Sequence, residues 1–134
     1  CMKNALTLFP NALASMPAVS HMPSGLQPEE IKVWIPACCF MLRPETLEIV
    51  GYFDEQFHPY NYEDVDYWTR IYQSKHTIAR DYSVMVQHQE GQVIHSFDDN
   101  GAVDAQNRQR YLEKWGFDPI PILYHGTAKF PWED

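Results

Sequence analysis

The sequence has no long apolar run and no cluster of positive charge. No stretch approaches the roughly 20 apolar residues that a membrane helix needs, so we expect no transmembrane segment. Ten Lys and Arg are scattered among 18 Asp and Glu, and the formal net charge is -8. Because a phosphate backbone is repelled by such a surface, nucleic acid is not an expected partner.

Cysteine is also scarce. Of three cysteines, Cys38 and Cys39 are adjacent, and adjacent cysteines close only a strained ring. A disulfide framework is therefore excluded, and we expect a reducing compartment, the cytoplasm. Both thiols lie in an apolar run without a basic neighbour that could activate them, which favours packing over nucleophilic chemistry.

What is present is the composition of one globular domain. The chain has 134 residues, of which 45% are hydrophobic and 21% charged. We predict three regions: a proline-rich loop or arm at 1–30, a folded unit at 31–116 and a proline-broken tail at 117–134 that wraps the surface. No repeat or low-complexity segment is found.

Two segments have strand character. Residues 31–42, IKVWIPACCFML, are β-branched, aromatic and then continuously apolar, as in a strand buried on both faces. Residues 77–88, TIARDYSVMVQH, predict two short strands around a turn at Arg80 and Asp81.

Three segments have helix character, and with the strands they give an α/β order. Residues 44–51, PETLEIVG, are bracketed by Pro and Gly. Asn61 can cap a second helix, and Asp98 or Asp99 can begin a third that ends at Gly116. The expected buried stripe of the second helix is Val65, Trp68, Ile71 and Tyr72.

The first turn of that second helix carries Glu63, Asp64 and Asp66. Three carboxylates this close repel one another, so at least one is expected to have a raised pKa that suits a general base. The alternative is an ordinary acidic helix N-terminus facing the helix dipole. Asp66 can equally pair with Arg70, four residues on.

Four motifs, spread over three segments of the sequence, give this chain a family resemblance. Residues 37–73, ACCFMLRPETLEIVGYFDEQFHPYNYEDVDYWTRIYQ, are followed by SVMVQH and then by NRQRYLEKWG. Together they resemble family 2 glycosyltransferases, including rhamnosyltransferase-like members, over about residues 33–116. The resemblance implies a partial GT-A fold, with a mixed sheet flanked by helices, that supplies the acceptor-side half of an inverting enzyme.

The resemblance also implies roles for individual residues. Asp64 is the general base that takes the proton of the acceptor hydroxyl. Glu63 and Asp66 orient the helix or bind acceptor hydroxyls, while Arg43 and Tyr62 belong to the acceptor side of the cleft. The partners implied are a nucleotide-sugar donor and a carbohydrate or other hydroxyl acceptor.

A divalent cation, manganese or magnesium, is the implied cofactor. His88 corresponds to the family's metal-binding histidine, since imidazole suits such ions. A structural histidine at a strand end is the competing interpretation, and His95 is a competing ligand.

The resemblance does not extend to the nucleotide-binding half, because nothing before residue 31 matches its strands and Asp-x-Asp motif. The donor site is then expected from upstream sequence or another chain, and a homo-oligomer is possible. One alternative is a non-catalytic carbohydrate-binding or assembly module that stacks sugars on Tyr62 and Trp68. A metal hydrolase using His58, His88 and His95 is a third interpretation, without a compact ligand motif.

Overall fold

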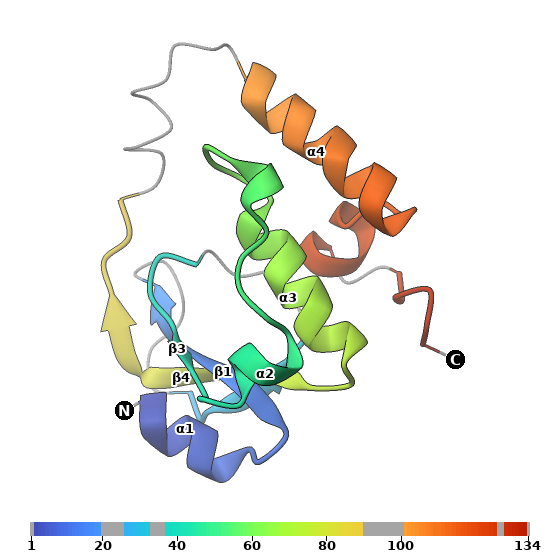
Figure 1. Ribbon diagram of the computed structural model, residues 1–134. Coiled ribbons are helices and arrows are strands. Elements are labelled where there is room, and N and C mark those ends of the chain that lie inside the picture. Colours follow the sequence, from blue (N-terminus) through green and yellow to red (C-terminus); the bar gives the residue numbers. More distant parts are fainter. Residues whose placement is uncertain (1, 20–25, 33–36, 90–100, 126–127, 134) are drawn as a thin grey trace.

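The computed structural model describes residues 2–19, 26–32, 37–89, 101–125 and 128–133, and it is α/β. Within these ranges, one mixed sheet has the strand order β2-β4-β1-β3 (Figure 1). The central strands β1 (Ala12–Val19) and β4 (Thr77–Val86) are parallel. The outer strands β2 (Glu29–Ile31) and β3 (Met41–Leu42) are antiparallel to their neighbours. No helix in the described ranges is long and apolar enough to cross a bilayer.

The predicted N-terminal loop is wrong for residues 2–19. Helix α1 (Met2–Leu8) precedes β1, which lies inside the sheet and is buried at every position. The strand tolerates Pro17 because the pairing with β4 shifts register there, between Pro17 and Ala18. Its alanines leave room for close packing of the layers, so proline density was a misleading signal.

The predicted strand at 31–42 is replaced by two short strands. β2 and β3 lie at opposite edges of the sheet, and residues 37–40 between them form no strand. The predicted turn at Arg80 and Asp81 is also wrong, because β4 runs through both residues. In place of a turn, β4 has a register shift. Pro17 of β1 pairs with Asp81, and the next residue, Ala18, pairs with Met85.

The three predicted helices are confirmed as α2 (Thr46–Ile49), α3 (Glu63–Gln73) and α4 (Ala102–Trp115). Gly116 ends α4 with φ 74°, as predicted, whereas Asp98 and Asp99 lie outside the described residues. A short 3₁₀ helix, η1 (Glu55–Phe57), precedes α3, and a π-helical turn, η3 (Ile120–Tyr124), follows α4.

Asn61 does not cap α3, contrary to prediction. Tyr62 occupies the cap position without a side-chain hydrogen bond, and both residues are left-handed, with φ 63° and 71°. This turn directs the Asn61 amide toward α4 instead, where it donates to Asp104 at 2.8 Å.

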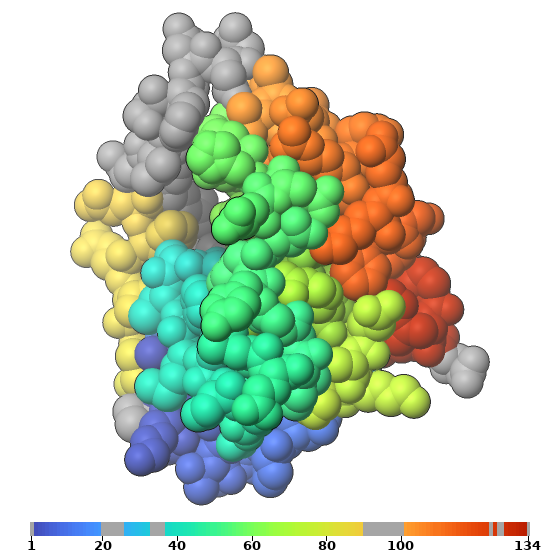
Figure 2. Space-filling model, in the orientation of Figure 1, coloured from blue at the N-terminus to red at the C-terminus, as the bar shows by residue number. Residues whose placement is uncertain are grey.

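The core lies between the sheet and α3. The predicted stripe on α3 is confirmed, since all its members are at most 2% exposed: Val65, Trp68, Ile71 and Tyr72. Helix α4 adds Tyr111, whose hydroxyl is 2.7 Å from that of Thr69 on α3. In Figure 2, α2 and the loop that follows it cover the middle of the visible face, between the end of β4 and α4.

The C-terminal tail is part of the core rather than a surface wrap. Leu123 and Phe130 are at most 2% exposed, and the Phe130 ring stacks on Trp132 at 4.7 Å. Phe130 also contacts Tyr72 of α3, with ring centroids 5.6 Å apart. The tail thereby joins the same hydrophobic core as α3 and the sheet, and the proline-broken pattern concealed this role.

Candidate functional site

Asp64 lies at the start of α3 and is 8% exposed. One carboxylate oxygen accepts a hydrogen bond from the Val65 amide at 2.7 Å, and the other accepts one from the Ala37 amide at 3.3 Å. The left-handed turn at Asn61 and Tyr62 brings the chain into the helix here, and the helix dipole stabilises negative charge at this end. Asp64 is therefore a fixed carboxylate at the rim of the core.

A cavity of about 400 Å³ adjoins Asp64. Its polar wall consists of Asp64 from α3, Asp104 from α4, Asn61 from the preceding turn and His125, which follows η3. The remaining lining residues are apolar or aromatic: Tyr62, Val65 and Ile120. The cavity thus combines one apolar wall with a few convergent polar groups, as small-molecule sites do.

Sequence reasoning missed Asp104 and His125. The sequence contains one indication for Asp104, because it is an acidic residue in the first turn of a predicted helix. No motif related it to Asp64. His125 follows a proline-broken segment without periodicity. The fold alone brings these two residues to the acidic turn.

Glu63 lies on a different cavity from Asp64. This second cavity measures about 450 Å³ and is lined by Phe53, Asp54, Glu55, Phe57, His58, Pro59 and Glu63. One Glu63 carboxylate oxygen is buried without a hydrogen-bond partner. Burial, and secondarily the charge of Asp64, raises the pKa of Glu63 above its ordinary value of 4.5. One of the three carboxyl groups therefore has the raised pKa that the sequence predicted, but it is Glu63 rather than Asp64, and burial contributes more than the neighbouring charge.

Replacement of Glu63 by Gln should remove part of the pH dependence of stability. A carboxyl group whose pKa is raised in the folded state favours folding below its unfolded pKa, and this contribution is lost as pH rises through the folded pKa. Between about pH 4 and pH 7, urea denaturation should show wild type losing stability relative to Glu63→Gln. The exposed neighbour Glu55 provides the control variant, Glu55→Gln. If the difference in unfolding free energy between wild type and Glu63→Gln stays the same across this pH range, the raised pKa of Glu63 is contradicted.

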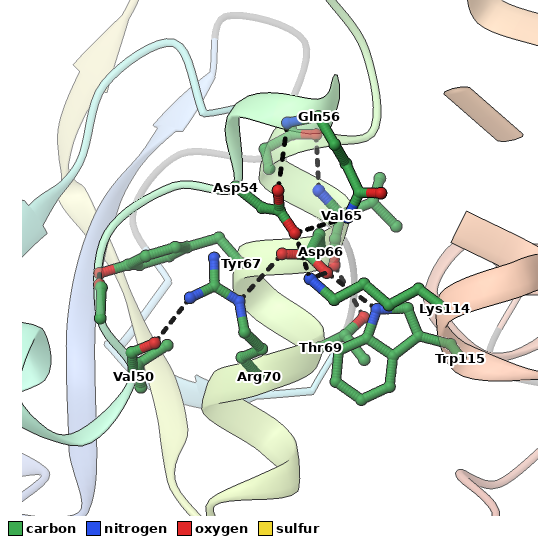
Figure 3. A network of polar contacts seen from close by, with 12 residues as sticks. Val50, Asp54, Gln56, Val65, Asp66, Tyr67, Thr69, Arg70, Lys114 and Trp115 are labelled. Atoms are coloured by element: carbon green, nitrogen blue, oxygen red, sulfur yellow. Dashed lines mark hydrogen bonds and ion pairs between the residues drawn. The ribbon is translucent and has the colours of Figure 1, made fainter. Parts of the chain in front are cut away.

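Asp66 is fully buried and connects three segments (Figure 3). Its carboxylate accepts from Arg70 Nε at 2.9 Å, from Trp115 Nε1 at 2.9 Å and from Lys114 Nζ at 2.7 Å. Lys114 also contacts Asp54 at 2.7 Å. The alternative of a pair with Arg70 is confirmed, and the burial of Asp66 leaves it the helix-orienting role rather than contact with an acceptor.

Arg43 also contacts the protein's own backbone. Its guanidinium donates to the carbonyls of Ala12 at 2.6 Å, Phe9 at 3.3 Å and Leu6. These contacts join α1 to β1, and Arg43 is not among the described residues that line the Asp64 cavity. These contacts give Arg43 a structural role. Its expected role on the acceptor side stays a prediction.

The predicted metal site is not assembled by the described residues. His88 is partly exposed, just beyond the end of β4, and His95 lies outside the described residues. Among the residues that the structure describes, no three His, Cys, Asp or Glu side chains are grouped so as to hold a metal ion. His88 as a manganese or magnesium ligand stays a prediction.

Comparison of the chain with protein-family models, with curated proteins and with solved structures found no match.

Proposed function

We propose that this chain is the acceptor-side half of an inverting glycosyltransferase with a partial GT-A fold, in which Asp64 is the general base. The observation that carries the proposal is the position of Asp64: a fixed carboxylate at a helix N-terminus, on the wall of a 400 Å³ cavity. A cavity of this size is within the range of small-molecule sites. The resemblance carried by the run 37–73, which contains Glu63, Asp64 and Asp66, points to the same residue.

The chemistry is a single displacement at the anomeric carbon of the donor sugar. The acceptor oxygen forms the new bond as the bond to the nucleoside diphosphate breaks, and the diphosphate leaves with the bonding electrons. Because attack comes from the face opposite the leaving group, the anomeric configuration inverts. Asp64 takes the proton that the acceptor hydroxyl loses, which raises the nucleophilicity of its oxygen.

The contacts of Asp64 suit that role. The amides of Val65 and Ala37 each hold one carboxylate oxygen, so the group is oriented before an acceptor arrives. Pre-positioning of this kind lowers the entropic cost of reaching the transition state. The apolar residues Val65 and Ile120 can face the ring carbons of a sugar while polar neighbours meet its hydroxyls.

The proposal includes a donor-binding partner. We propose that the nucleotide-sugar is held by a segment or a second chain that completes the GT-A sheet, with a divalent metal at His88 as part of that site. Cys38 and Cys39 are free thiols, which supports the proposed cytoplasmic location.

A non-catalytic sugar-binding module has less support from the same geometry. Trp68 is fully buried and packs edge-on against Phe40 at 5.5 Å, so it offers no open ring face on which a sugar could stack. Tyr62 lines the Asp64 cavity and is the one of the two predicted stacking residues that a sugar could contact. The burial of Trp68 therefore favours the enzyme over the module.

The test of the proposed function is acceptor-dependent release of nucleoside diphosphate. The chain, alone and extended by its upstream reading frame, is incubated with UDP-, GDP- and dTDP-sugars, manganese and a panel of sugar acceptors, and free diphosphate is quantified. We expect acceptor-dependent release from one donor class once the donor site is complete. If release is absent from both forms with every donor and acceptor, or proceeds equally without acceptor, the transferase proposal fails.

A further inference from the structure

The described residues that line the cavity beside Asp64 include two carboxylates, Asp64 on α3 and Asp104 on α4, and no Lys or Arg. Arg108, one turn beyond Asp104 on α4, is paired with Asp118. Arg108 therefore interacts most strongly with Asp118 and more weakly with Tyr62 and Asp104.

Asp104 itself has no ion-pair partner among the described residues. One of its carboxylate oxygens accepts a hydrogen bond from the Asn61 amide at 2.8 Å. This contact orients the carboxylate but leaves its charge in place, because a neutral amide is the donor. Burial, and secondarily the charge of Asp104, raises the pKa of the Tyr62 hydroxyl, which lines the same cavity, and the opposing effect of Arg108 is smaller than that of Asp104.

On the basis of the proposed function, we infer that the acceptor is a sugar or similar polyol bearing a positively charged group, and that Asp104 selects it. In this arrangement the reacting hydroxyl meets Asp64 while an ammonium group meets Asp104. A concave, partly apolar wall strengthens charge interactions relative to open water. Neutral acceptors bind less tightly, and acceptors with a carboxylate or phosphate are repelled.

The division of labour between the two carboxylates follows from their surroundings. Asp64 is fixed by two backbone amides at the helix start, as a base needs to be. Asp104 is held by a side chain from another segment, at the first turn of α4. Removing the charge of Asp104 should therefore change which acceptor binds and leave the proton-accepting group in place.

The experiment uses three sugars that differ only at carbon 6: methyl 6-amino-6-deoxyglucoside, methyl glucoside and methyl glucuronide, with the galacto and manno series beside them. Their dissociation constants are measured by titration calorimetry at neutral pH and low salt, without donor. We expect affinity to fall from the amine to the alcohol to the acid, by about two- to fivefold at each step. High salt should reduce the differences in affinity among the three sugars, because it screens exposed charges.

Asp104→Asn should remove the preference for the amine over the acid, whereas Asp104→Glu should retain it. Glu48→Gln on α2 makes the same change in net charge away from the cavity and should leave the ranking intact. Equal binding of the three sugars, no binding of any series, or a ranking that survives Asp104→Asn would each overturn the inference.

The outcomes separate this inference from the proposed function. If the ranking and its dependence on Asp104 hold but no sugar is transferred, the cavity has the inferred preference and the transferase proposal fails. If transfer occurs with amine and acid acceptors at the same efficiency, the transferase stands and the inferred selection by Asp104 fails.

Discussion

Asp64→Asn is expected to lower the rate of sugar transfer by about 10²- to 10⁴-fold, the usual contribution of a positioned general base. Asparagine keeps the shape of the side chain, and its carboxamide oxygen can still accept the Val65 amide at the helix start. It cannot accept the proton of the acceptor hydroxyl. The loss should therefore appear in kcat, with little change in the KM of the acceptor.

The matched control for Asp64→Asn is Glu48→Gln, which removes one negative charge from an exposed position on α2. Steady-state kinetics of both variants, with circular dichroism to verify folding, distinguishes loss of the base from loss of charge. A folded Asp64→Asn variant with more than a third of wild-type kcat would eliminate Asp64 as the base.

Asp66→Ala is expected to destabilise the fold by about 3 kcal/mol, near the lower end of the range for removing one partner of a buried ion pair. The change leaves Arg70 and Lys114 without their buried carboxylate and frees the indole N–H of Trp115 (Figure 3). The cost stays near the lower end because Lys114 keeps Asp54, and Arg70 keeps the Val50 carbonyl at 2.6 Å.

Urea denaturation measures this effect, and Lys32→Ala serves as its contrast. Lys32 pairs with Glu133 at the surface, with half of its side chain exposed, so its removal should cost at most about 1 kcal/mol. If Asp66→Ala costs no more than Lys32→Ala, the buried network does not hold α3 against α4.

Helix α3 could be predicted because its signals are local. Val65, Trp68, Ile71 and Tyr72 recur at helical spacing, and burial of one face follows directly from that period. Strand β1 could not be predicted, because its alanines and Pro17 resemble a loop until β4 pairs beside them. The strand character of that segment comes from its partners rather than from its own propensities.

The candidate site was predictable in part for the same reason. Asp64 lies in a contiguous motif, and its position at a helix start follows from the sequence. Asp104 and His125 reach the same cavity only because α4 and the segment after η3 pack against α3. Asp66 shows the converse case: its spacing to Arg70 predicted one contact, but the contacts to Lys114 and Trp115 depend on how α4 docks.

The most direct test of the central claim is the stereochemistry of the product. An α-linked nucleotide-sugar of the active donor class is reacted with the acceptor, and the anomeric proton of the product is followed by NMR from the first turnover. The account predicts a β-linked product that forms with wild type and is reduced at least about 100-fold with Asp64→Asn. A product that retains the α configuration, or one that forms equally fast with Asp64→Asn, would contradict it.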